Sequence, residues 1–232
     1  MDQRHDIAGL IGKGLYSVSE AGRLTSIPAS RIGRWLNGRT RIYRGETVFD
    51  RPLWMPELPV TDGQLNLSFR DLIEVRMVDR FRNRGLSLPY IRKVVEAARA
   101  IVGESHPFTS NSFKTDGKRV YQEVLSKTDE PKLIEVLEGQ HAFHSIIALG
   151  LKDIEFEDGA LVLWRPETGR SDVILDPARA FGQPILGQSG VSTAIIKLAF
   201  ESGRSSREIG RDFEISERSV RSALAFEAKL AA

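Results

Sequence analysis

The stretch "YSVSEAGRLTSIPASRIGRWLNGR", from Tyr16 to Arg39, decides the fold of the first part of the chain. Ser17 followed three residues later by Glu20 is the capping-box pattern of a helix N-terminus. A second helix follows a proline, and Ile32 and Trp35 recur on one of its faces with helical spacing. Asn-Gly then ends it. The stretch therefore predicts two short helices joined by a tight turn.

The second of these helices has the character of a DNA-recognition helix. If Ile32 and Trp35 face inward, Arg31 and Arg34 face outward and can enter a major groove. The following segment, "RIYRGETVFD", is β-prone around Gly45 and predicts a hairpin, or wing, whose arginines contact phosphates. Between residues 15 and 44 there are six arginines and one acid. A helical hairpin with solvated arginines remains the alternative. The predicted DNA contacts are Ser30, Arg31, Arg34, Arg39, Arg41, Tyr43 and Arg44.

Further helices and hairpins are predicted along the middle of the chain. Apolar periodicity indicates helices over residues 68–84 and 89–102, and "EPKLIEVLE" (130–138) indicates a short one. Two Asp-Gly pairs, Asp116-Gly117 and Asp158-Gly159, stand between β-prone flanks and predict hairpins. We therefore expect a mainly α fold with small β hairpins. Its expected domains are residues 14–102, a hairpin-containing middle of residues 103–171, and a C-terminal helical domain of residues 172–232.

The last 45 residues predict three helices, over 191–201, 205–213 and 216–230. The last two repeat the helix–turn–helix pattern of the front stretch, but the charges of residues 172–232 balance at eight against eight. A dimerisation, partner-binding or core module is therefore the favoured interpretation. Arg218 and Arg221 keep an auxiliary contact with DNA or a partner open.

Composition narrows the classes of function. The chain has no cysteine, which excludes disulfides and thiolate chemistry. Residues 1–100 carry 17 Lys and Arg against 11 Asp and Glu, whereas residues 101–171 carry 8 against 12, so a polyanion would bind the front. We find no catalytic motif, metal-ligand set or cofactor motif. We expect a cytoplasmic protein, nucleoid-associated when bound to DNA, with no enzymatic activity, no membrane span, no metal and no cofactor.

The front of the chain resembles the MerR-like winged-helix family over residues 14–102. The likeness lies in "YSVSEAGRLTSIPASRIGRWL" and in "LSFRDLIEVRMVDRFRNRGLSLPYIRKVV", which begins at Leu67. It implies a winged helix–turn–helix that binds DNA. The proline-rich insertion over residues 51–67 departs from the family pattern and bears on the geometry of the wing.

The tail is similar to a different family, a small helix–turn–helix-like domain once of unknown function. The matching text runs from "VILDPARAFGQPILGQSG" (173–190) through the last three helices. Members of that family are commonly antitoxins paired with PIN-like ribonuclease toxins, and longer members with a MerR-like front domain resemble VapB-type antitoxins. One departure is that Gly187-Gln188-Ser189 replaces the usual "GtR".

These resemblances imply an antitoxin of a type II toxin–antitoxin system. Such a protein would neutralise a PIN-like toxin and, as a homodimer, bind double-stranded operator DNA to regulate its own transcription. A stand-alone MerR-like transcriptional regulator that senses a small ligand through its middle region is the alternative. A protein-interaction adaptor that binds no DNA is a third possibility.

Overall fold

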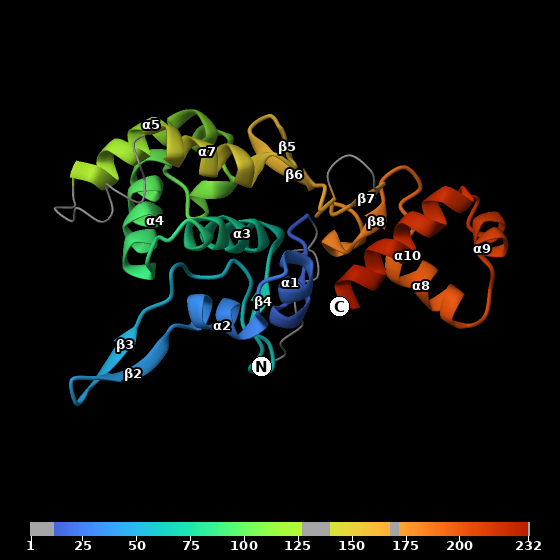
Figure 1. Ribbon diagram of the computed structural model, residues 1–232, viewed down its shortest axis with the longest axis horizontal. Helices are drawn as coiled ribbons and strands as arrows, with labels where there is room; N and C mark the ends of the chain where they lie inside the picture. Colours follow the sequence, from blue (N-terminus) through green and yellow to red (C-terminus); the bar gives the residue numbers. More distant parts are fainter. Residues whose placement is uncertain (1–11, 127–139, 168–171, 232) are drawn as a thin grey trace, which may run out of the picture. The chain divides into compact units, whose positions relative to one another are not determined.

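The fold is mainly helical, with small two-stranded antiparallel sheets, in a computed structural model that describes residues 12–126, 140–167 and 172–231 (Figure 1). The chain divides into two compact units. The larger unit comprises Ser17–Lys152 and Phe156–Leu161. The C-terminal unit comprises Met1–Tyr16, Asp153–Glu155 and Val162–Ala232. Each unit is described by itself.

The larger unit begins with the predicted pair of helices. Both bonds of the capping box are present, since the Ser17 hydroxyl accepts from the Glu20 amide and the Glu20 carboxylate accepts from the Ser17 amide. The hairpin that follows pairs Arg39 with Asp50 and Tyr43 with Glu46, so the predicted wing is confirmed as a two-stranded sheet. The elements are β1 (Tyr16–Ser17), α1 (Val18–Thr25), α2 (Ala29–Asn37), β2 (Arg39–Tyr43), β3 (Glu46–Asp50) and β4 (Asn66–Leu67).

An aromatic cluster forms the core behind these elements. The ring of Phe81 lies 5.7 Å from that of Phe108 and 5.6 Å from that of Phe143. Phe113 and Tyr121 extend the cluster, each contacting one of these rings. Burial of such large side chains is a strong driving force for folding. The cluster joins α3 (Phe69–Asn83), the 3-10 helix η2 (Pro107–Thr109), α5 (Asn111–Ser126) and α7 (Gln140–Leu151), with α4 (Leu88–Val102) packed on α5.

The hairpin predicted at Asp116-Gly117 is wrong, because this pair lies inside the helix α5. A β-carbon added at Gly117 would stand 2.8 Å from Cδ1 of Ile147 on α7. The glycine therefore permits two helices to approach closely, which a local turn pattern does not reveal. The short helix predicted over residues 130–138 lies outside the described residues.

A buried carboxylate, that of Asp71 near the start of α3, anchors the proline-rich insertion. Its oxygens accept hydrogen bonds from the Trp54 indole at 2.7 Å and from the Glu57 amide at 3.1 Å. The same carboxylate completes the capping box of α3 with Ser68 and lies 2.8 Å from Nε2 of His106. Burial raises the pKa of Asp71, but the hydrogen bonds from His106, Ser68 and Trp54 outweigh it and leave the pKa lowered. The insertion is thus fixed to the helix that follows it.

After α7 the chain forms a hairpin, whose tip (Phe156–Leu161) belongs to the larger unit, and then the short sheet and the three helices of the C-terminal unit. The turn at Asp158-Gly159 has positive φ at both residues, 49° and 82°, so the second predicted hairpin is confirmed. Val173 pairs with Leu186 in the other sheet. The elements are β5 (Ile154–Glu157), β6 (Ala160–Trp164), β7 (Val173–Ile174), the 3-10 helix η3 (Ala180–Gly182), β8 (Ile185–Leu186), α8 (Thr193–Glu201), α9 (Ser206–Asp212) and α10 (Glu217–Ala231).

Two residues from near the start of the chain belong to this C-terminal unit. The hydroxyl of buried Tyr16 donates to the Gly182 carbonyl at 2.6 Å. Leu15 exchanges two bonds with the same loop, since its amide donates to the Phe181 carbonyl and its carbonyl accepts from the Gln183 amide side chain. The unit is therefore assembled from segments distant in sequence. Within the described parts of the chain, no helix has the length and apolarity needed to cross a membrane.

We predict that Glu74 makes the larger unit less stable at alkaline pH. Burial raises the pKa of this carboxyl to about 8, and its Oε1 accepts from the Phe108 amide at 2.8 Å. Because the pKa in the folded chain lies above the unfolded value of 4.5, the protonated Glu74 contributes its full share to the free energy of unfolding below about pH 4.5. That contribution is then lost as pH rises towards about 8. Chemical unfolding between pH 5 and 8.5 should show a falling free energy of unfolding.

Glu74→Gln is the matched variant, because its amide oxygen can accept the same hydrogen bond without ionising. The variant should show a flatter pH dependence over this range. Equal slopes for the two proteins would contradict the assignment.

Candidate nucleic-acid interface

The helix α2 is held rigidly by its apolar face. Ile32, Trp35 and Leu36 are buried, and the Trp35 carbonyl accepts from the Leu53 amide at 2.8 Å. The turn before α2 is equally constrained, since a β-carbon on Gly22 would lie 2.9 Å from the Ile27 carbonyl oxygen. These contacts fix which residues of α2 face solvent.

Arg31 and Arg34 leave α2 from the exposed side, as the sequence predicts, but they differ in their partners. Nη1 of Arg31 lies 3.4 Å from Oδ1 of Asp79 on α3, and the Arg31 side chain is 43% exposed. Arg34 is exposed, and its Nε donates to the Ser30 carbonyl one turn earlier. Ser30 is also exposed. Arg34 is thus directed by its own helix, whereas Arg31 is tethered to a neighbouring one.

The wing arginines share one carboxylate. Asp50 on β3 accepts from Nε of Arg39 at 3.2 Å and from Nε of Arg41 at 2.9 and 3.1 Å. The hydrogen bond from Arg41 is the main reason that the pKa of Asp50 is lowered. One acid therefore orients two guanidinium groups on the same face of the hairpin. It also cancels part of the positive charge that the sequence assigns to the wing.

The turn of the wing carries the remaining predicted contacts. Arg44 is exposed and has a φ of 52° beside Gly45 at 83°, so both residues of the turn are left-handed. Tyr43 ends β2, but its side chain lies outside the described part of the structure. Arg218 and Arg221, the predicted auxiliary contacts, belong to α10 of the C-terminal unit.

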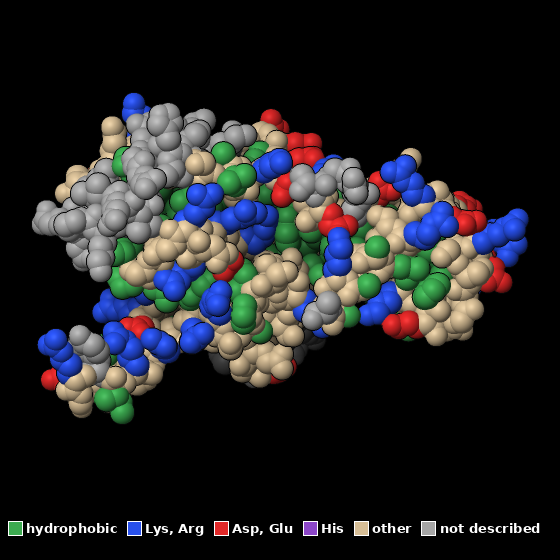
Figure 2. All heavy atoms as spheres, viewed as in Figure 1, with side chains coloured by type: hydrophobic (Ala, Val, Ile, Leu, Met, Phe, Trp, Pro, Cys, Tyr) green, Lys and Arg blue, Asp and Glu red, His purple; other side chains and the backbone are tan. Residues whose placement is uncertain are grey.

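A groove of about 680 Å³ connects α2, the wing and the start of α4. We call it the cationic groove, because its lining contains eight cationic side chains and only two acids, Asp50 and Glu96. Figure 2 shows Lys and Arg side chains gathered along the wing and the adjoining surface of α2 and α4. So many cations on one concave surface create a positive potential that attracts polyanions. The cationic residues are Arg31, Arg34, Arg39, Arg41, Arg51, Arg82, Arg92 and Lys93.

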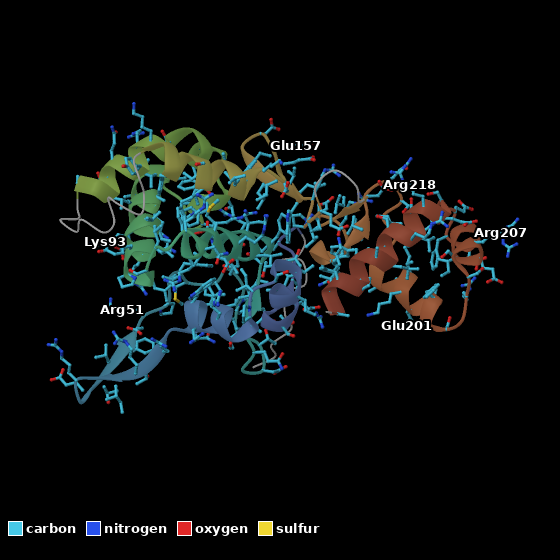
Figure 3. All side chains as sticks on the ribbon, in the orientation of Figure 1. Arg51, Lys93, Glu157, Glu201, Arg207 and Arg218 are labelled. Atoms are coloured by element: carbon cyan, nitrogen blue, oxygen red, sulfur yellow. The ribbon has the colours of Figure 1, made fainter. Side chains whose placement is uncertain are left out.

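The last four of these residues were not predicted from the sequence. Arg92 has a structural role, because it donates to the carbonyls of Pro52 at 2.7 Å and Arg51 at 2.6 Å and so joins α4 to the base of the wing. Nη1 of Arg82 donates to the Leu86 carbonyl. Arg51, at the base of the wing, and Lys93, on α4, both line the groove (Figure 3). The adjacent Arg92 and Lys93 in "PYIRKVV" can be seen in the sequence as a pair of cations. Their position beside the wing, however, depends on how α4 packs in the folded chain.

The chemistry of the interface is that of anion binding. Guanidinium groups bind phosphate and base edges in two-pronged geometry, and ammonium groups bind phosphate as point charges. Among the described residues, no group of three or more His, Asp or Glu side chains is arranged to hold a metal ion.

Comparison with known proteins places the chain near a small set of mycobacterial proteins. No protein-family model matches it. A protein of Mycobacterium tuberculosis named "Putative antitoxin VapB45" is 27% identical over 221 residues, which cover 90% of this chain and 92% of that protein. "Uncharacterized protein Rv2308" of the same organism is 23% identical over 96% of this chain and 94% of its own length.

The fold also has a solved counterpart. The crystal structure of Rv2018 from Mycobacterium tuberculosis matches with a TM-score of 0.71 and 24% identity, over 90% of this chain and 96% of that one. The chain is therefore a distant homologue, over nearly its full length, of a protein named as an antitoxin, and it shares its fold with Rv2018.

We predict that Gly22 is required by the turn that positions α2. Gly22→Ala would force its new methyl group against the Ile27 carbonyl oxygen, and overpacking of this kind costs about 1–3 kcal/mol. Gly33→Ala is the matched control, because a β-carbon there meets nothing within 4 Å and alanine favours helix. Urea unfolding should show destabilisation in the first variant and none in the second. Equal midpoints would contradict this account of the turn.

Proposed function

We propose that the chain is the antitoxin of a type II toxin–antitoxin pair and that it binds operator DNA to regulate its own transcription. The cationic groove beside α2 is the observation that carries the DNA-binding part of the proposal. The homology to a protein named as an antitoxin supports the other part. The toxin proposed as its partner is a PIN-like ribonuclease.

The proposed DNA complex is that of a MerR-like winged helix. Helix α2 enters the major groove, where Arg34 and Arg31 meet base edges. Arg31 exchanges its contact with Asp79 for one with DNA. Arg39 and Arg41 reach phosphates from the wing while Asp50 holds their orientation. Arg51 and Lys93 extend the phosphate contacts along the groove.

The C-terminal unit supplies the proposed association surface. Ile195 and Leu198 lie on α8 and are 52% and 68% exposed, and Phe181 in η3 is 49% exposed. Ile195 and Leu198 lie one turn apart on α8, and exposed apolar side chains that form a patch mark protein-binding surfaces. A homodimer formed in this way would read a two-fold operator, because half-sites mirror the symmetry of the protein.

We predict that the groove arginines determine operator affinity. Arg34→Ala and Arg31→Ala should each weaken binding by about 1–3 kcal/mol if they contact bases. Arg51→Ala should weaken binding to all sequences alike and lower the salt dependence, because it removes a phosphate contact. Electrophoretic mobility shift with DNA from upstream of the coding region, at several salt concentrations, measures both effects.

Arg119→Ala is the matched control for these variants. It removes one arginine from the same unit, but Arg119 is exposed on α5, pairs with Asp116 and does not line the groove. Its operator affinity should equal that of the unmodified protein. Unchanged affinity in the Arg31 and Arg34 variants would remove α2 from the interface.

We predict that a neighbouring gene encodes a toxic PIN-like protein that binds this chain. Expressing the neighbour alone should arrest growth, and expressing both proteins should restore it. The two proteins should also purify together by size-exclusion chromatography. Normal growth with the neighbour alone would contradict the antitoxin proposal and favour a stand-alone regulator.

A further inference from the structure

The helix–turn–helix of the larger unit recurs in the C-terminal unit with an offset of 188 residues. Ser17 and Glu20 form the capping box of α1, and Ser205 and Glu208 form that of α9. The isoleucine of the turn is also shared, since Ile27 and Ile215 occupy the same position between the two helices of each motif. This correspondence extends from sequence to geometry.

The two turns agree in three independent measures. A β-carbon on Gly22 would lie 2.9 Å from the Ile27 carbonyl oxygen, and one on Gly210 would lie 2.9 Å from that of Ile215. The amide of each isoleucine donates to the carbonyl of the corresponding glycine, at 3.1 and 2.8 Å. The residue before each isoleucine is left-handed, with φ of 57° in the first turn and 55° in the second. The second motif is therefore a genuine helix–turn–helix.

The second helices of the two motifs also face the same way. Val220 and Ala223 of α10 are buried at the positions of Ile32 and Trp35 in α2. The side chains of Arg218 and Arg221 are exposed at the positions of Ser30 and Gly33. Each helix thus presents two arginines among the four positions of its outer N-terminal face, residues 30, 31, 33 and 34 in α2 and residues 218, 219, 221 and 222 in α10.

The second motif has no net charge, but several of its acidic side chains already form contacts within the C-terminal unit. Glu208 caps its own helix, Asp212 pairs with Arg204, and Glu217 lies 3.4 Å from Arg221. Among the residues that the structure describes, Arg218 and Arg207 form no ion pair, and both are directed away from the ribbon in Figure 3. The outer face of α10 continues with the small exposed residue Ala225, which permits close approach of a DNA backbone.

We propose that α9 and α10 form a second DNA-reading head, with Arg218 and Arg221 as its contacts to the duplex. This inference rests on the proposal that the chain binds DNA through the cationic groove. The second head has no net charge and binds weakly by itself. Once the first head is bound, the connection through one chain raises the effective concentration of the second head at neighbouring base pairs, so even a weak site adds affinity.

The test uses the full chain and two duplexes that share one operator centre. The short duplex ends at the boundary of the footprint left by a protein with Arg218→Ala and Arg221→Ala, and the long duplex extends about 15 base pairs beyond it on each side. On the long duplex, the double variant should bind about tenfold or more weaker than the unmodified protein, as expected for loss of specific arginine contacts. On the short duplex, the two proteins should bind equally. The footprint of the unmodified protein should be the longer one.

Two controls separate DNA contact from charge and folding. Lys197→Ala with Arg165→Ala removes two cations from the same unit, at sites paired with Glu201 and Glu155, and should leave both affinities unchanged. Arg218→Lys with Arg221→Lys keeps the charge but loses the two-pronged geometry, so it should show an intermediate loss with an unchanged salt dependence.

The outcomes distinguish this inference from the proposed function. Equal affinity and footprint for the unmodified protein and the Arg218 and Arg221 double variant on the long duplex would overturn the second head. If the same variant lost only its binding to the toxin, α10 would be a protein-binding helix and the inference would also be overturned. If the Arg31 and Arg34 variants bound the short duplex as well as the unmodified protein does, the proposal that DNA binds in the cationic groove would be overturned instead.

Discussion

The buried carboxylate of Asp71 is the constraint on which the larger unit depends. It receives hydrogen bonds from an indole, two backbone amides and a serine hydroxyl and contacts an imidazole, and these groups come from three separate segments of chain. A buried charge is tolerated only when its hydrogen-bonding capacity is used fully. The proline-rich insertion, α3 and the loop before η2 therefore have to assemble together. Because the wing is attached to the insertion, the position of the wing follows from this assembly.

The cationic groove is built on this scaffold. Arg92 joins α4 to the backbone at the base of the wing, so its charge contributes to the groove while its hydrogen bonds are structural. Other cations, such as Arg34, are oriented only by their own helix. A surface built from both kinds combines rigidity with side chains that remain able to adapt to a ligand.

Local patterns in the sequence predicted the elements better than their arrangement. The capping box of Ser17 and Glu20, the apolar stripe of Ile32 and Trp35 and the hairpin around Gly45 depend on neighbours within a few residues, and all three are confirmed. The hairpin predicted at Asp116-Gly117 is wrong, because the glycine is needed for close packing against Ile147, which is 30 positions away in the sequence. In the same way, sequence proposed Arg31 and Arg34 as exposed residues of a helix, but the participation of Arg51 and Lys93 depends on tertiary packing. The contacts of Asp50 with Arg39 and Arg41 likewise could not be predicted without knowing the register of the hairpin.

That carboxylate has a consequence for the thermodynamics of binding. A cationic surface normally carries condensed or diffuse ions from solution, and their release on binding supplies entropy and makes affinity depend on salt. Asp50 is a counterion that belongs to the chain itself, and in the proposed complex it would stay with Arg39 and Arg41 when they meet a phosphate. If the wing binds DNA as proposed, it would release fewer solution ions than its number of arginines suggests. Its contribution to DNA affinity would then be less sensitive to the ionic conditions of the cell.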